Sequence, residues 1–192
     1  MGKAALGFKP RTGRAVLVTI AMDEQPRVVD RAEVALLPRG EMAPYHAADG
    51  LPSDAADKHV KAAVSRAERL ASDAIRDAVK RASAAGHDVQ GCGVLVGTGM
   101  PAWSTDDILA VHVRMHKAEG EMFRDILVAA AREQGFEPVT LPDKTALDAA
   151  ARKLGIKRAK LDAQLAALGK AAGSTWGAHQ KEAAAAALAA LA

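Results

Sequence analysis

The chain has 192 residues, of which 49% are hydrophobic and 3% aromatic, and its formal net charge is +3. This length and composition suit one domain with a single core, spanning residues 1–192. No apolar run approaches the roughly 20 residues that cross a membrane, and no cleavable signal precedes the first strand pattern. The single cysteine, Cys92, excludes an intrachain disulfide. We therefore expect a soluble cytoplasmic protein whose slight positive charge permits nucleic-acid binding without requiring it.

The first forty residues predict three consecutive strands. Turn residues separate three apolar stretches, at 6–8, 15–20 and 27–37. Consecutive strands joined by short turns tend to pair, so this region predicts an antiparallel meander. Breaker residues then predict a loop over residues 38–52.

Residues 53–85 predict a long helix. Apolar residues recur there at helical spacing, charged residues occupy the opposite face, and Gly86 is a natural C-terminal stop. Residues 89–96 predict a short strand that is apolar enough to be central in a sheet, and the turn beginning at Gly97 ends it.

A second long helix follows this turn. Ser104 and Asp107 form a capping-box pattern, and apolar residues continue at helical spacing to near Gly135. The rest of the chain predicts a strand and then three helices, at 136–141, 143–154, 158–168 and 178–191. Strand–helix–strand units build parallel pairs. The fold class is therefore α/β, with a mixed five-stranded sheet, three antiparallel strands followed by parallel ones, and helices on both faces.

This order of elements is that of the ribonuclease H-like superfamily, and local motifs resemble the RuvC-type Holliday junction resolvases. Gly7-Phe8-Lys9-Pro10 is similar to the Gly-Ile-Asp-Pro opening of that family. Residues 94–144 resemble its fourth strand, long helix and fifth strand, with Ala118-Glu119-Gly120 where the family often has Ala-Arg-Gly. Residues 155–160 resemble its basic segment, and His179-Gln180-Lys181-Glu182-Ala183 stands where the family has Asp-x-x-Asp-Ala.

The resemblance implies a two-metal nuclease mechanism, in which four acidic residues hold Mg²⁺ or Mn²⁺. The four corresponding positions here are Lys9, Gly97 or its neighbour Val96, His179 and Glu182. Lysine and glycine cannot ligate a metal ion, whereas His179 and Glu182 can. Lys9 is expected either to pair with Glu182 or to be solvated at the strand end. A compensating carboxylate could come from Asp106, Asp107 or Asp143.

Two histidines and one glutamate suggest a different kind of site. His112, His116 and Glu119 lie at i, i+4 and i+7 on the second long helix, so they share one face and could bind a transition metal. The alternative is a chance pairing on a helix surface or at a subunit contact. His46 has no partner in the sequence, as is also true of His59, and both are expected to be exposed.

The densest basic cluster comprises Lys153, Lys157, Arg158 and Lys160. Such residues on neighbouring turns could contact successive DNA phosphates, and the scarcity of aromatic residues favours recognition of shape over base stacking. A solvated cluster without a partner is the alternative.

The turn Gly97-Thr98-Gly99 follows a strand and precedes a capped helix, so its amides could hold a phosphate. It resembles the sugar kinase and actin-like superfamily and the related threonylcarbamoyl-transfer proteins. A tight turn that only ends the strand is the alternative.

The leading prediction is a RuvC-like protein that binds structured or branched DNA, or a protein partner, without cutting. A homodimer contact is expected on an exposed apolar part of the second long helix. The alternatives are a metal-dependent nuclease with an altered site, acting as an endodeoxyribonuclease-like hydrolase, and a phosphate or nucleotide binder.

Overall fold

The computed structural model describes residues 2–173 and 176–192. Five strands form one sheet in the order β3-β2-β1-β4-β5. The strands are β1 (Gly2–Arg11), β2 (Arg14–Met22), β3 (Pro26–Ala35), β4 (His87–Val96) and β5 (Val139–Pro142). The first three pair antiparallel, and β4 pairs parallel with both β1 and β5. The predicted mixed five-stranded sheet is confirmed.

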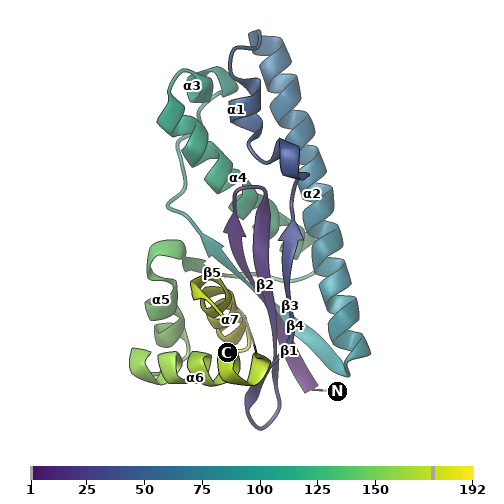
Figure 1. The fold of residues 1–192 in the computed structure, drawn as a ribbon, viewed down its shortest axis with the longest axis vertical. Coiled ribbons are helices and arrows are strands. Elements are labelled where there is room, and N and C mark those ends of the chain that lie inside the picture. The colour runs from purple at the N-terminus through teal and green to yellow at the C-terminus, as the bar shows by residue number, and fades with distance from the viewer. Residues whose placement is uncertain (1, 174–175) are drawn as a thin grey trace.

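Helices cover both faces of this sheet, as the sequence predicts. They are α1 (Pro44–Ala48), α2 (Ser53–Ala84), α3 (Thr105–Leu109), α4 (His112–Glu133), α5 (Ala146–Lys153), α6 (Arg158–Ala172) and α7 (Ala178–Ala190), with short 3₁₀ turns η1 (Arg39–Glu41) and η2 (Asp143–Thr145). The pair α2 and α4 packs on one face, and α5, α6 and α7 cover the other (Figure 1). No helix of the described residues is long and apolar enough to span a membrane.

Strand alternation divides the core into two layers. In β1, Leu6 and Phe8 face the layer under α2 and α4, where they pack with Phe123. In β2, Val16 and Val18 face the alanines of α7. Successive strand side chains point to opposite faces, so a single strand supplies both layers.

The last helix lies very close to the sheet because three strand positions are glycine. A Cβ at Gly7 would overlap the Ala183 carbonyl oxygen, and Cβ atoms at Gly91 and Gly93 would likewise meet α7 backbone. The alanine-rich helix therefore packs tightly, and its first turns lie beside the end of β1. This contact brings the N-terminal residues of α7 to the candidate site.

The predicted helix over residues 104–135 is two helices. The capping box of Ser104 and Asp107 is present at the start of α3, but Val111 adopts an extended conformation, with φ −142° and ψ 112°, and α4 starts afresh. No glycine or proline marks this break. The redirected α3 packs against α1 and α2, and this tertiary contact outweighs helix continuity.

The predicted loop over residues 38–52 also differs, because it contains η1 and the one-turn helix α1. Pro44 begins α1, and Tyr45 and Ala48 are buried against the first core layer. One turn is too short for its periodicity to stand out in a sequence. The sixth helix is longer than predicted and continues through Gly169, against which the Trp176 ring packs.

Candidate functional site

Lys9 is buried at the end of β1, with 8% of its surface exposed. Its ammonium donates a hydrogen bond to Asp143 Oδ1, and it lies 3.1 Å from Glu182 Oε2. The predicted pairing of Lys9 with Glu182 is confirmed, and the alternative of a solvated lysine is wrong. A lysine so poorly exposed needs a carboxylate partner, because burial of an unpaired charge is costly.

Asp143 is the first residue after β5 and lies at the middle of the site. One of its carboxylate oxygens accepts from Lys9, and the other accepts from Arg124 Nη2 at 2.9 Å. Of the three aspartates considered as compensating carboxylates, only this one lies here. Asp106 accepts a hydrogen bond from Ser53, and Asp107 caps α3.

Glu121 stands directly over Gly97 at the end of β4. A Cβ added at Gly97 would overlap the Glu121 carboxylate, which is buried and lies 3.6 Å from Arg124 Nη1. A carboxylate is therefore present beside the end of β4, although it comes from α4. The sequence reasoning missed Glu121 and Arg124. The available signal was an acidic and a basic residue at i, i+3 beside the buried Met122 and Phe123.

His179 lies at the rim of this site, in the first turn of α7. Its side chain is 43% exposed, and its Nδ1 is 3.7 Å from Glu182 Oε2. We call the whole group the charged centre: Lys9, Glu121, Arg124, Asp143, His179 and Glu182. The structure thus brings together Lys9, Gly97, His179 and Glu182, as the resemblance implies.

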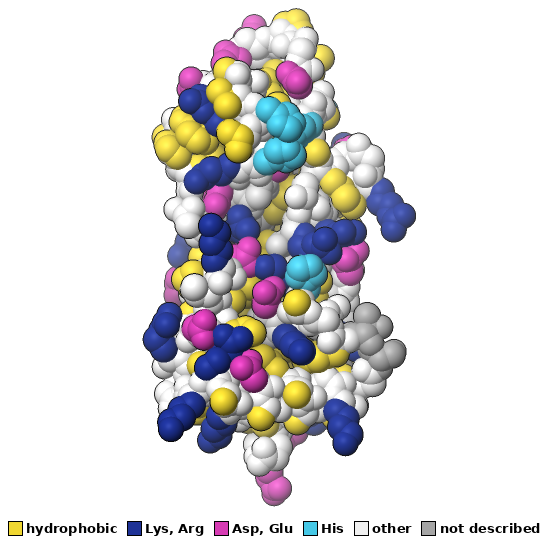
Figure 2. Space-filling model, turned by 60° about the vertical axis from the view of Figure 1, so that its left-hand side comes forward, with side chains coloured by type: hydrophobic (Ala, Val, Ile, Leu, Met, Phe, Trp, Pro, Cys, Tyr) yellow, Lys and Arg dark blue, Asp and Glu magenta, His cyan; other side chains and the backbone are white. Residues whose placement is uncertain are grey.

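Two cavities flank Asp143. One, of about 320 Å³, is lined by Lys9, Arg11, Thr12, Arg14 and His179, together with Pro10 and Asp143. The other, of about 150 Å³, includes Gly97, Thr98, Glu121, Arg124 and Lys144 in its lining. Lysine, arginine, aspartate and glutamate side chains gather across the middle of the face shown in Figure 2. The centre is therefore open to solvent on both sides of Asp143.

The charges of the centre do not fit the two-metal arrangement that the resemblance implies. Mg²⁺ requires oxygen ligands in octahedral geometry. Here the Lys9 ammonium lies between the Asp143 and Glu182 carboxylates, and the Arg124 guanidinium binds the second oxygen of Asp143. A divalent ion would have to displace Lys9 to reach both carboxylates. Lys9 and Arg124 instead offset two of the three carboxylate charges of the centre.

The glycine turn does not form a phosphate cradle. The Glu121 carboxylate lies against Gly97, so a phosphate there would meet a negative charge. Gly99 has φ +70°, a left-handed conformation that glycine adopts without strain. The tight-turn interpretation is favoured.

The predicted basic cluster lies at the junction of α5 and α6, at the far end of α5 from Asp143. Arg158 donates hydrogen bonds to Asp162 at 2.9 Å and Asp148 at 2.7 Å, and these bonds raise the pKa of Arg158. Lys153, Lys157 and Lys160 are exposed. The three lysines therefore present their charges to solvent.

The predicted histidine site has a different composition. His112 and His116 do lie together, but the third ring is His46 of α1, and Glu119 accepts hydrogen bonds from His46. The expectation that His46 is exposed and has no partner is wrong, because its side chain is 28% exposed and contacts Glu119. His59 is exposed on α2, as expected.

Cys92 is a fully buried core residue. Burial raises the pKa of its thiol to about 12, so the thiolate is not available at neutral pH. Cys92 therefore serves as a small hydrophobic residue of the core.

No protein-family model and no curated protein matches this chain in sequence. Among solved structures, the chain is similar to T. thermophilus RuvC in complex with Holliday junction substrate, with a TM-score of 0.52 and 13% identity. That match covers 97% of this chain and 91% of the other. It is also similar to a Thermus thermophilus RuvC structure, with a TM-score of 0.50, 12% identity and coverage of 97% and 92%. The chain therefore has the RuvC-like ribonuclease H fold.

Proposed function

We infer that this protein binds structured or branched DNA and does not cleave it by divalent-metal catalysis at the charged centre. The observation that carries this proposal is the position of the Lys9 ammonium between the Asp143 and Glu182 carboxylates. The similar T. thermophilus RuvC is in complex with a Holliday junction substrate, which supports DNA as the ligand class.

Positive side chains around the centre support contact with phosphates. Arg11 and Arg14 line the larger cavity, and Lys144 lines the smaller one. Arg14 lies 3.4 Å from Glu33, an exposed pair that a phosphate could replace at little cost. Lys153, Lys157 and Lys160 offer a second set of phosphate contacts at the α5–α6 junction.

The test is binding of a labelled four-way junction against a linear duplex of the same sequence, at several salt concentrations, with cleavage followed in the same tubes with Mg²⁺ or Mn²⁺. We expect tighter binding of the junction, affinity that falls steeply with salt, and no cleavage. Failure to bind either DNA at low salt would remove the nucleic-acid proposal and favour a protein-interaction module.

A charge-matched pair of variants locates the surface. Lys144→Ala should weaken junction binding. It should also reduce the slope of log affinity against log salt concentration by about one, as expected for the loss of one phosphate contact. Lys80→Ala removes an equivalent exposed lysine from α2 and should leave binding unchanged. Equal losses in both variants would contradict binding at the charged centre.

The proposed homodimer would use the exposed start of α4. Val113 is 69% exposed and Val111 is 38% exposed, so apolar surface remains uncovered there in the single chain. Sedimentation of the full chain should give a dimer, and Val113→Asp should shift it toward monomer. A monomer at all concentrations would contradict this part of the proposal.

A further inference from the structure

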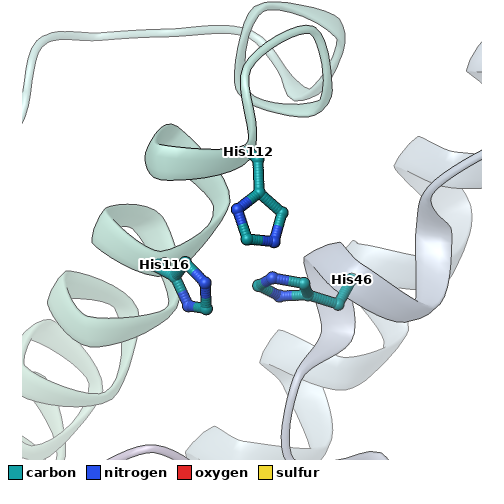
Figure 3. A group of neighbouring side chains, drawn as sticks. All are labelled: His46, His112 and His116. Atoms are coloured by element: carbon teal, nitrogen blue, oxygen red, sulfur yellow. The ribbon is translucent and has the colours of Figure 1, made fainter.

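Three histidine rings converge where α1 meets the start of α4. His46 comes from α1, and His112 and His116 are one turn apart on α4 (Figure 3). Each ring offers a nitrogen, and these three nitrogens lie within 4.8 Å of one another. The ring centroids are 4.5–5.1 Å apart. No ion pair or hydrogen bond joins one ring to another within the described residues.

Glu119 fixes the orientation of His46. This glutamate is 2% exposed, and its Oε1 accepts from the His46 backbone N–H at 3.2 Å and from Nδ1 at 2.9 Å. A carboxylate can only accept, so the bond assigns the hydrogen to Nδ1 and leaves the Nε2 lone pair free when the ring is neutral. Metal-binding histidines commonly donate their other ring nitrogen to a carboxylate in this way.

The Nε2 atom of His46 takes no part in the hydrogen bonds that the described residues make. Nε2 is buried and has no hydrogen-bond partner among the described residues. A buried polar atom without a partner is unfavourable and calls for an explanation such as a bound ion. The two rings of α4 that lie beside it are exposed, so an ion can reach the group from solvent.

We propose that His46, His112 and His116 form a Zn²⁺ site, with Glu119 as the residue that positions His46. Imidazole nitrogens suit zinc and related transition metals, whereas Mg²⁺ and Ca²⁺ select oxygen ligands. A tetrahedral ion with Zn–N bonds of about 2.0–2.1 Å places its ligand nitrogens about 3.3 Å apart. Rotation of the exposed His112 and His116 rings would close the present spacing, which is up to 4.8 Å, to that value.

Three protein ligands leave one tetrahedral position open, for water or for a donor atom from a partner. The ion ties the segment between β3 and α2 to α4. It thereby holds α1 in place through coordination as well as through the burial of Tyr45 and Ala48. The site does not rest on the DNA-binding proposal, and the two can fail separately.

The test is titration of the tag-free full chain with ZnCl₂ by calorimetry, together with Co²⁺ absorption spectra. We expect about one ion per chain and the visible bands of tetrahedral Co²⁺. Thermal unfolding should shift upward with zinc, because the ion binds the folded chain. His46→Ala should show no zinc binding in the same titration, whereas His59→Ala is the control that keeps all three proposed ligands.

The variants separate a three-ligand site from a chance pair. His46→Ala should lose zinc binding although His112 and His116 remain, and His59→Ala should bind as the wild type does. Glu119→Gln should lower the affinity for zinc by about 10-fold to 100-fold and should keep the same Co²⁺ absorption bands. Zinc affinity equal in His46→Ala and wild type would overturn the proposal, as would no zinc binding by the wild type. Circular dichroism of each variant checks that it is folded.

Discussion

The charged centre and the histidine cluster both gather potential metal ligands, and α4 contributes to both, yet they use those ligands differently. In the charged centre, the Asp143 and Glu182 carboxylates are already paired with Lys9. In the histidine cluster, Nε2 of His46 is buried without a hydrogen-bond partner, and so is Glu182 Oε2 in the charged centre, but of these two atoms only the glutamate oxygen has an ammonium beside it. A carboxylate that already neighbours an ammonium of the protein resists a metal cation, whereas an oriented imidazole nitrogen without a cation beside it favours one. The residue types alone do not distinguish the two cases.

The largest expected effect is loss of the internal cation. Lys9→Met leaves Asp143 and Glu182 without their ammonium, and removal of one partner from a buried pair costs about 3–5 kcal/mol. Urea unfolding measures the change in the free energy of unfolding. Lys80→Met, at an exposed site on α2, should change it by less than about 0.5 kcal/mol. Equally small changes in the free energy of unfolding of Lys9→Met and Lys80→Met would mean that the pairing of Lys9 contributes little to stability.

The second prediction converts the charged centre into an ion-binding one. Lys9→Asp places a fourth carboxylate beside Glu121, Asp143 and Glu182, so repulsion should destabilise the variant and Mg²⁺ should restore it. At about 100 times the dissociation constant, the ion stabilises by about 2.7 kcal/mol. Mg²⁺ is chosen because imidazole clusters bind it poorly. If Mg²⁺ raised the unfolding temperature of the wild type as much as that of Lys9→Asp, the claim that Lys9 keeps the ion out of the charged centre would be contradicted.

A smaller effect is expected at the end of β4. Gly97→Ala adds a Cβ that overlaps the end of the buried Glu121 side chain, and moving this carboxylate beside Arg124 should cost about 1 kcal/mol, the low end of the range for overpacking. Gly40→Ala is the control, since nothing lies within 4 Å of a Cβ there. Urea unfolding of both variants checks the difference. Equal stabilities would show that Glu121 moves away without cost.

The smallest effect concerns the only thiol. Cys92 lies in the core and does not belong to the histidine cluster, so Cys92→Ala should leave zinc affinity unchanged. Burial also raises the pKa of its thiol to about 12. The folded pKa lies above the unfolded one, so the unfolded thiol loses its proton first and stability falls as pH rises from about 9 toward 12. At pH 8 a thiol reagent should label the unfolded chain rapidly and the folded chain slowly. Rapid labelling of the folded chain would contradict this burial.

Local signals in the sequence predicted much of the fold. The turn residues, the capping box at Ser104 and the stop at Gly86 each mark a boundary that the structure retains. The break at Val111 was missed, because it depends on how α3 packs rather than on a breaker residue. The one-turn α1 was missed because a single turn has no visible period.

The sites were less predictable, because they depend on contacts between distant parts of the chain. Lys9 and Asp143 are 134 positions apart, and His46 and Glu119 are 73 apart. The family resemblance located Lys9, Gly97, His179 and Glu182, but it held no information on Glu121 and Arg124. His46 could not be joined to His112 without the position of α1.

The most direct test of the central claim is single-turnover incubation of a four-way junction with excess protein in Mg²⁺, comparing the wild type with Glu182→Ala. The Lys9 ammonium holds Asp143 and Glu182, so the wild type should bind the junction and leave it intact, as the variant does. Junction cleavage by the wild type that disappears in Glu182→Ala would contradict this account.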